Sequence, residues 1–161
     1  MTTTVELKEK VGPAMGRIAS GVYIVTVGDK DGGPDGMLAT WLGQGGFNPP
    51  SVAMAVNKQR DILKRLEPGS RFAVNVLSKN NMDIFKAFAK PHNEEKFAGL
   101  SLLEGTDCPV FSTCVSYMIL QVKGQMDAGD HQIVLGEVVD GGALNVQDEP
   151  MTHLRKDGFQ Y

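Results

Sequence analysis

The sequence predicts a mostly β protein with short helices, folded as an antiparallel barrel of about six strands. Short segments rich in β-branched and aromatic residues recur along the chain, separated by turns rich in glycine and proline. Only two or three segments have helical periodicity, and helices do not alternate with strands as they do around a parallel sheet. The chain has neither a GxGxxG segment opening a helix nor a P-loop, so a bound nucleotide would not be held as in a Rossmann fold.

The first half of the chain is expected to form a helix, a hairpin and a buried strand. Apolar residues at helical spacing predict a helix within residues 5 to 18. A β-branched strand from Gly21 to Val27 and a second strand from Met37 flank a glycine-rich turn, which predicts a hairpin. Val52 to Val56 is apolar throughout, which predicts a strand buried on both faces.

The second half combines two helical segments with three strands and a final hairpin or sheet edge. Pro68-Gly69 and Pro91 each end a helical pattern, and residues 92 to 109 are polar and irregular. The expected elements are helices at 62–66 and 80–90, strands at 72–77, 111–124 and 132–139, and a final hairpin or sheet edge formed by 143–146 and 151–154.

Length and composition favour a single domain over residues 1–161, with an ordinary share of apolar residues. The net charge of −3 gives no basic face for nucleic acid, and no apolar run is long enough to span a membrane. The first residues lack the pattern of a signal peptide, so we expect a cytoplasmic protein with reduced Cys108 and Cys114. Cysteine and histidine residues are not spaced as metal ligands, so we expect no metal.

The stretch from Gly36 to Pro50 is the segment in which a binding site is most strongly indicated. Three glycines, at positions 43, 45 and 46, remove side chains where a ligand could approach the backbone. Pro49 and Pro50 restrict the chain that follows. Exposed backbone N–H groups on such a loop suit a flat, hydrogen-bonding ligand. The alternative is an ordinary strand and turn in which Trp41, the only tryptophan, packs as a core residue.

Four segments that follow one another in this order cover nearly the whole chain: residues 20–27, Gly36–Pro50 with the strand 52–56, residues 72–77, and Gly129-Asp130-His131 before 133–138. Together they resemble the flavin reductase family, and the closest likeness is to the flavin-reductase modules of flavodiiron proteins. The resemblance implies a six-stranded antiparallel Greek-key split barrel that binds FMN. It also implies a homodimer with flavin sites at or beside the interface. Because a barrel this small should be filled by its own side chains, we expect Val22, Ile24, Val52, Met54, Val56, Val74 and Val76 inside it.

The resemblance also assigns residues to the cofactor. It places a first group along the flavin, with backbone groups facing its N5 and pyrimidine edge: Met37, Leu38, Ala39, Thr40, Trp41 and Gln44. A second group, Asn57, Lys58, Arg60 and Asp61, lies where a strand ends and a helix begins. Free N–H groups and cations at such a point suit a phosphate, with Lys58 and Arg60 as its ligands. The alternative is a solvated basic turn.

Three further sites complete the predicted set. Asn75 lies between apolar residues in a strand, so it contacts either the flavin or a structural partner. His131 follows Gly129-Asp130, and the resemblance places it over the flavin face that receives the nicotinamide. Arg155 and Tyr161 belong to a tail that, by the same resemblance, closes the flavin pocket; the alternative is a frayed terminus. His92 and His153 are expected at the surface.

The function that follows is NAD(P)H-dependent reduction of FMN, with hydride passing from nicotinamide C4 to flavin N5. Electrons would then leave to free flavin, oxygen, a ferric chelate or a partner protein. Two alternatives stay open: a flavin-bearing electron carrier similar to flavoredoxin, and an FMN-binding barrel without turnover. The expected cofactors are FMN and either NADH or NADPH.

Overall fold

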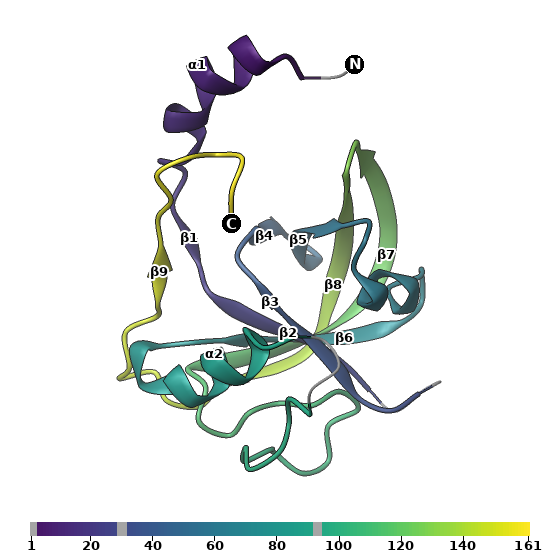
Figure 1. Ribbon diagram of the computed structural model, residues 1–161. Helices are drawn as coiled ribbons and strands as arrows, with labels where there is room; N and C mark the ends of the chain where they lie inside the picture. The colour runs from purple at the N-terminus through teal and green to yellow at the C-terminus, as the bar shows by residue number, and fades with distance from the viewer. Residues whose placement is uncertain (1–2, 29–31, 92–94) are drawn as a thin grey trace.

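The computed structural model describes residues 3–28, 32–91 and 95–161 (Figure 1). His92 and the middle of the turn at 29–31 lie outside the described residues. The elements, in chain order, are α1 (Val5–Met15), β1 (Ser20–Gly21), β2 (Tyr23–Val27), β3 (Asp35–Ala39), β4 (Leu42–Phe47), β5 (Pro50–Asn57), the 3-10 helix η1 (Asp61–Arg65), β6 (Arg71–Val76), η2 (Lys79–Asn81), α2 (Met82–Phe88), β7 (Ser116–Ala128), β8 (His131–Ala143) and β9 (Thr152–His153). None of the helices in these ranges has the length and apolar character needed to cross a membrane.

Seven strands of the described chain form one antiparallel sheet in the order β3-β2-β6-β7-β8-β5-β4. The expected antiparallel, mostly β architecture is confirmed, but the expected six-stranded Greek-key barrel is not, because the sheet has seven strands and is not closed. The additional strand is β4, whose sequence LGQGGF is poor in strand-forming side chains. It pairs with β5 through main-chain hydrogen bonds, which glycine can make as well as any residue. The expected loop at 43–50 is therefore a hairpin with a turn at Asn48-Pro49.

The two ends of the sheet are joined by Thr40 and Trp41. β3 is paired only with β2, and β4 is paired only with β5, among the strands described. The chain leaves β3 after Ala39 and reaches β5 at once, since the Trp41 carbonyl accepts a hydrogen bond from the Ala55 N–H at 2.9 Å. Thr40 and Trp41 therefore cross the split between the two sheet edges, beside the free edge of β3.

The main core lies between the faces of the rolled sheet and is built around Phe72, Leu120 and Met54. Val52, Val56 and Val74 belong to it as expected, whereas Val22 and Ile24 pack in a second cluster with Phe88 and Phe111. The reason is strand alternation: in β2, Val25 and Val27 point into the main core, so Ile24 points to the opposite face. Val76 is only half-buried.

β5 also differs from the prediction of burial on both faces. Val52, Met54 and Val56 are buried, while Ala53 and Ala55 are half-buried. Alanine is compatible with either environment, so the apolar run did not reveal the alternation. The half-buried face is the one on which Ala55 meets the site described below.

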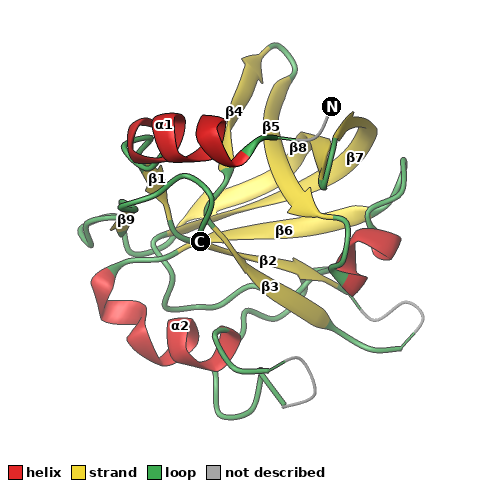
Figure 2. Ribbon diagram, turned by 45° about the horizontal axis from the view of Figure 1, so that its top comes forward, coloured by secondary structure: helices red, strands yellow, loops and turns green. Residues whose placement is uncertain are grey.

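α2 and its flanking turns lie beside β3 and cover the second cluster (Figure 2). The predicted helix over 80–90 begins instead as the 3-10 turn η2, capped by Ser78, and becomes α-helical only at Met82. The predicted strand from Phe111 begins at Ser116, and Phe111 makes only an isolated bridge with Leu102.

α1 and the C-terminal residues form a unit apart from the sheet, which we call the terminal arm (residues 3–21 and 152–161; Figure 1). β9 pairs with β1, in the register Ser20 with His153, so the hairpin that was one alternative for 143–146 and 151–154 is wrong. Two backbone hydrogen bonds tie the tail to α1 and the residue after it. The Gly158 N–H donates to the Gly12 carbonyl at 2.7 Å, and the Arg155 N–H donates to the Gly16 carbonyl at 3.2 Å. Both chain ends are thus held together above the split.

Candidate functional site

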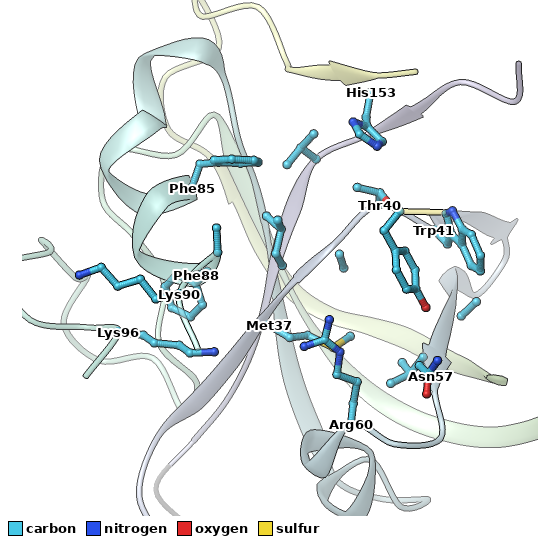
Figure 3. A pocket seen from close by; sticks show the side chains of 17 residues that line it. Met37, Thr40, Trp41, Asn57, Arg60, Phe85, Phe88, Lys90, Lys96 and His153 are labelled. Carbon is cyan, nitrogen blue, oxygen red and sulfur yellow. The ribbon is translucent and has the colours of Figure 1, made fainter. Parts of the chain in front are cut away.

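Two adjoining cavities lie at the split in the sheet, and we call them the strand cavity and the tail cavity. The strand cavity, of about 400 Å³, lies between β3, α2 and the turn after β5 (Figure 3). The tail cavity, of about 770 Å³, lies between α1, the C-terminal tail and the β7–β8 turn. Both volumes fall in the range of small-molecule sites. Trp41, Ala55, Asn57 and Tyr161 line both cavities and so form the wall between them.

The free edge of β3 forms one side of the strand cavity. Met37, Leu38 and Ala39 line it, and Thr40 and Trp41 continue the same side. Since β3 has a strand partner only on its β2 side, the peptide groups on its other edge are available for a ligand. The opposite side is apolar, with Phe85 and Phe88 contributed by α2. A flat ring with a polar edge is the shape and chemistry that such a space accepts.

The far end of the strand cavity is cationic, because Arg60, Lys90 and Lys96 all line it. Lys96 is only 9% exposed. Burial lowers the pKa of Lys96; the nearby Asp35 carboxylate opposes this, and the positive charge of Arg60 adds to it. The Lys96 ammonium also lies 5.8 Å from the centre of the Phe88 ring, which holds it in a cation–π contact.

His131 occupies the tail cavity and is 8% exposed. Its Nδ1 lies 2.8 Å from the Asp130 carboxylate, and its Nε2 lies 2.6 Å from the Tyr161 hydroxyl. The carboxylate can only accept, so Nδ1 carries a hydrogen, and Nε2 of the neutral ring accepts from Tyr161. The hydrogen bond from His131 lowers the pKa of Asp130. Both ring nitrogens are therefore engaged, one by the β7–β8 turn and one by the tail.

Trp41 is at the centre of an aromatic and cationic cluster rather than in the core. Its ring centre lies 4.9 Å from that of His131 and 5.3 Å from that of Tyr161. The Arg155 guanidinium stacks over it at 5.1 Å. The tail thus reaches the site through Arg155 and Tyr161, and the frayed terminus that was the alternative is not what the structure has.

The predicted site residues divide into those at the cavities and those away from them. Eight line the strand cavity: Met37, Leu38, Ala39, Thr40, Trp41, Asn57, Arg60 and Tyr161. His131 lines the tail cavity, and Arg155 lines neither cavity but stacks over Trp41 and donates to the carbonyls of Gly158 and Gln160, which line the tail cavity. The other four, Gln44, Lys58, Asp61 and Asn75, line neither cavity.

Each of these four has a partner elsewhere. Lys58 forms an ion pair with Asp127 on β7 and lowers the pKa of that carboxyl, chiefly through their hydrogen bond. Asp61 pairs with Lys64, at 3.0 Å. Gln44 is exposed on the β4–β5 hairpin and bonds weakly to the Gly46 carbonyl at 3.4 Å.

Asn75 is fully buried, and backbone groups satisfy its amide. Its Nδ2 donates to the Ile24 carbonyl at 3.2 Å, and its Oδ1 accepts from the Phe111 N–H at 2.9 Å. These bonds tie the segment around Phe111 to the β2–β6 pair. The contacts support the structural alternative for Asn75 and leave no free group for a flavin.

The sequence analysis did not predict every cavity residue, and Phe85, Phe88, Lys96 and His153 are among those it missed. Phe85 and Phe88 lie in the segment 80–90, which was predicted as a helix but not as the wall of a site. Lys96 lies in the irregular segment after α2, where no local pattern marks it. His153 was expected at the surface but is half-buried and lines the strand cavity, because β9 pairs with β1 across the top of the site.

The chain belongs to the flavin reductase like family, since the model of the flavin reductase like domain matches residues 15–160. Diflavin flavoprotein A 1 from Synechocystis sp. is 34% identical over 152 residues, which are 92% of this chain and 26% of that protein. A Rhizobium meliloti protein named "probable flavin reductase" is 32% identical over 86% of this chain and 44% of its own length. The chain thus spans about a quarter of the diflavin flavoprotein and under half of the second relative.

Solved structures agree with this assignment. The NADH:FAD oxidoreductase of Streptomyces globisporus, in complex with NAD and FAD fragments, superimposes with a TM-score of 0.80 at 25% identity. The match covers 98% of this chain and 93% of that one. The mostly β fold found here is therefore shared with that oxidoreductase, in agreement with the flavin reductase like family.

The residues that line the strand cavity are also chemically suited to a flavin. A flavin mononucleotide has a flat ring with an apolar end, a hydrogen-bonding edge and an anionic tail. The strand cavity offers Phe85 and Phe88, the free edge of β3 and the Arg60–Lys96 end, in one connected space. Each part of the cofactor therefore meets the chemistry that it requires.

Proposed function

We propose that this protein is an NAD(P)H-dependent flavin oxidoreductase that binds FMN in the strand cavity. The observation that carries the proposal is the free backbone edge of β3 facing an apolar wall, with cations at the end of the same cavity. When bound, the flavin supplies the hydride-accepting atom, N5, and passes the electrons on to an acceptor. That acceptor would be free flavin, oxygen, a ferric chelate or a partner protein.

The chain's own residues bind and orient in this proposal. Peptide groups at Met37–Ala39 would hold the polar edge of the ring. Asn57, which lines both cavities, is positioned to contact either the ring or the nicotinamide. His131, held by Asp130, would orient the dihydronicotinamide entering through the tail cavity. Hydride transfer itself requires no protein acid or base.

The name of the Streptomyces globisporus structure includes both NADH and FAD. It supports a nicotinamide as the donor and makes FAD the competing cofactor. We favour FMN because the cations lie within the strand cavity itself, where a single phosphate at the end of the ribityl chain would meet them. Chromatography of the cofactor released from the purified protein separates the two, and release of FAD alone would contradict FMN.

The test of the activity is anaerobic stopped-flow reduction by NADH and by NADPH, followed by flavin absorbance. We expect the wild-type holoprotein to be reduced, and His131→Ala to be reduced about ten to a hundred times more slowly because orientation is lost. FMN affinity should be nearly unchanged, since His131 does not line the strand cavity. If instead flavin binding collapses while the remaining holoprotein is reduced normally, His131 is structural.

A flavin-bearing electron carrier is the second candidate, and one observation favours it. Tyr161 and Asp130 already engage both nitrogens of His131, and Tyr161 stands in the wall of the tail cavity. A carrier would need no nicotinamide there. Reduction by dithionite or a reduced partner protein, with no reduction by NADH or NADPH in either wild type or a variant lacking Tyr161, would establish this reading.

We further propose that the protein works as a homodimer. Four apolar residues of the terminal arm, Val5, Leu7, Met15 and Ile18, are exposed, and Phe47 at the tip of the β4–β5 hairpin is 89% exposed. Exposed apolar surface beside a site is typical of an interface between subunits. Light scattering of the FMN-loaded protein checks this, and a mass near the 17.4 kDa of one chain would contradict it.

A further inference from the structure

The segment 154–161 lies over the tail cavity, and we call this segment the lid. After β9 the chain turns back below α1 towards the split in the sheet (Figure 1). Residues 158–161 of the lid line the tail cavity, and Tyr161 lines the strand cavity as well. The lid is therefore one wall of the space in which the proposed function places the nicotinamide.

Tyr161 covers His131 from the side of the lid. Its hydroxyl lies 2.6 Å from Nε2 of His131, and Asp130 holds the other ring nitrogen. His131 is 8% exposed, whereas Tyr161 is 67% exposed. An exposed side chain thus occupies the one imidazole nitrogen that Asp130 leaves available. Because Nε2 of the neutral ring has a single lone pair, another ligand can bond to it only after Tyr161 has moved.

The contacts that keep the lid in place are few and close to the solvent. The Arg155 guanidinium stacks over Trp41 at 5.1 Å and donates to the carbonyls of Gly158, at 3.1 Å, and Gln160, at 2.8 Å. Arg155 therefore both folds the lid and fastens it to the wall between the cavities. Of the lid residues, all of which the structure describes, only Gly158 is buried. A segment with so little burial opens at a small cost in free energy.

We propose that the lid is an autoinhibitory element, in which Tyr161 holds His131 until a dihydronicotinamide displaces the lid from the tail cavity. The identity of the displacing ligand rests on the proposed function, whereas the lid is defined by contacts within this chain. The ligand competes with the Tyr161 hydroxyl for His131 and with the Tyr161 ring for Trp41. Its apparent affinity is therefore reduced by the fraction of molecules in which the lid is closed.

The first test measures access to His131 and requires neither flavin nor nicotinamide. Diethyl pyrocarbonate modifies accessible imidazoles, and peptide mass mapping gives the rate at His131 itself. Tyr161→Ala and Arg155→Met should raise this rate about threefold to tenfold, as expected for losing one hydrogen bond's preference for the closed lid. Lys156→Met is the matched control, because this neighbouring cation is exposed and lines neither cavity. Equal rates in wild type and Tyr161→Ala would refute the lid.

The second test asks whether the ligand displaces the lid. Hydrogen exchange is compared in the FMN-loaded protein with and without NAD⁺ or NADP⁺, the oxidised forms of the two donors. We expect residues 155–161 to lose protection when either one binds. A gain of protection would show that the segment closes over the ligand, and unchanged protection would show that it stays in place; either result would overturn the proposal.

The third test separates autoinhibition from a positioning role of Tyr161. In stopped-flow reduction, Tyr161→Phe should lower the half-saturating donor concentration about threefold to tenfold and leave the maximal rate unchanged, because it removes only the competing hydroxyl. A lower maximal rate at the same half-saturating concentration would mean that Tyr161 positions His131, and the lid would not be autoinhibitory.

Failure of the proposed function has a different signature. If neither NADH nor NADPH reduces wild type but one of them reduces Tyr161→Ala, the closed lid blocks the donor completely, as the proposal allows. If neither donor reduces either protein, the proposed function fails, and the modification rates at His131 decide by themselves whether the lid covers the site.

Discussion

The sheet and the terminal arm contribute to the same site but are held together very differently. The sheet packs around fully buried side chains such as Phe72, Leu120 and Val74. Within α1, by contrast, only Gly12 is buried, and seven large apolar side chains of the arm are exposed. The arm depends on backbone bonds to its own tail and on the two-residue ladder between β1 and β9. We infer that the arm can open without unfolding the sheet, because local stability follows local burial.

This difference matters because the two regions supply different parts of the site. The sheet and the turn after β5 provide the β3 edge, Asn57 and Arg60. The arm provides Arg155 over Trp41 and Tyr161 against His131. Flavin binding should therefore depend mostly on the sheet, and access to His131 mostly on the arm.

The largest effect should come from removing a buried aromatic ring of the sheet, and removing a partly exposed ring of the arm should cost much less stability. Phe72→Ala removes a ring that is 0% exposed, and it should lower the free energy of unfolding by about 3–5 kcal/mol. Phe159→Ala removes a ring that is 42% exposed, and it should cost less than about 1 kcal/mol. Denaturant unfolding measures both. Similar costs for the two variants would show that the arm is as integral to the fold as the sheet.

An intermediate effect is expected where the tail passes α1. A Cβ at Gly16 would lie 2.8 Å from the Arg155 carbonyl oxygen and from the Asp157 N, so Gly16→Ala should push the tail away, at a cost of about 1–3 kcal/mol. Hydrogen exchange should show lost protection in residues 155–161 and little change in the sheet. Gly43→Ala is the control, since nothing lies within 4 Å of a Cβ there. Unchanged protection of the tail in Gly16→Ala would mean that α1 does not hold it.

The last effect appears only at high pH, and it arises from a buried thiol beside the sheet. Burial raises the pKa of the Cys114 thiol from 9.0 to about 11. The unfolded thiol ionises first as pH rises, so folding stability should fall between pH 9 and about 11, by at most about 1.4 kcal/mol per pH unit. Unfolding curves across this range, compared with those of Cys114→Ala, isolate the contribution. An identical pH slope in both proteins would contradict it.

The sequence by itself determined the class of fold, because alternation and turn residues act locally. The hairpin of β2 with β3, the strands β5 and β6, and the family-like order of segments all follow from such local patterns. Met37 to Trp41 and His131 were predicted as flavin-site residues from the family resemblance, and the structure places each of them at one of the two cavities. The sequence did not predict β4, because the strand is held by main-chain pairing with β5 and its side chains do not follow a strand pattern.

Only the tertiary structure decided which charges meet. Lys58 and Arg60 are nearly adjacent in sequence, yet the turn directs one to Asp127 and the other into the strand cavity. Lys96, which no local pattern distinguishes, reaches the same end of that cavity from beyond α2. Likewise, β9 pairs with β1 rather than with its sequence neighbours, which carries His153 and Tyr161 to the split in the sheet. Such meetings depend on long-range packing, and residue spacing along the chain does not encode them.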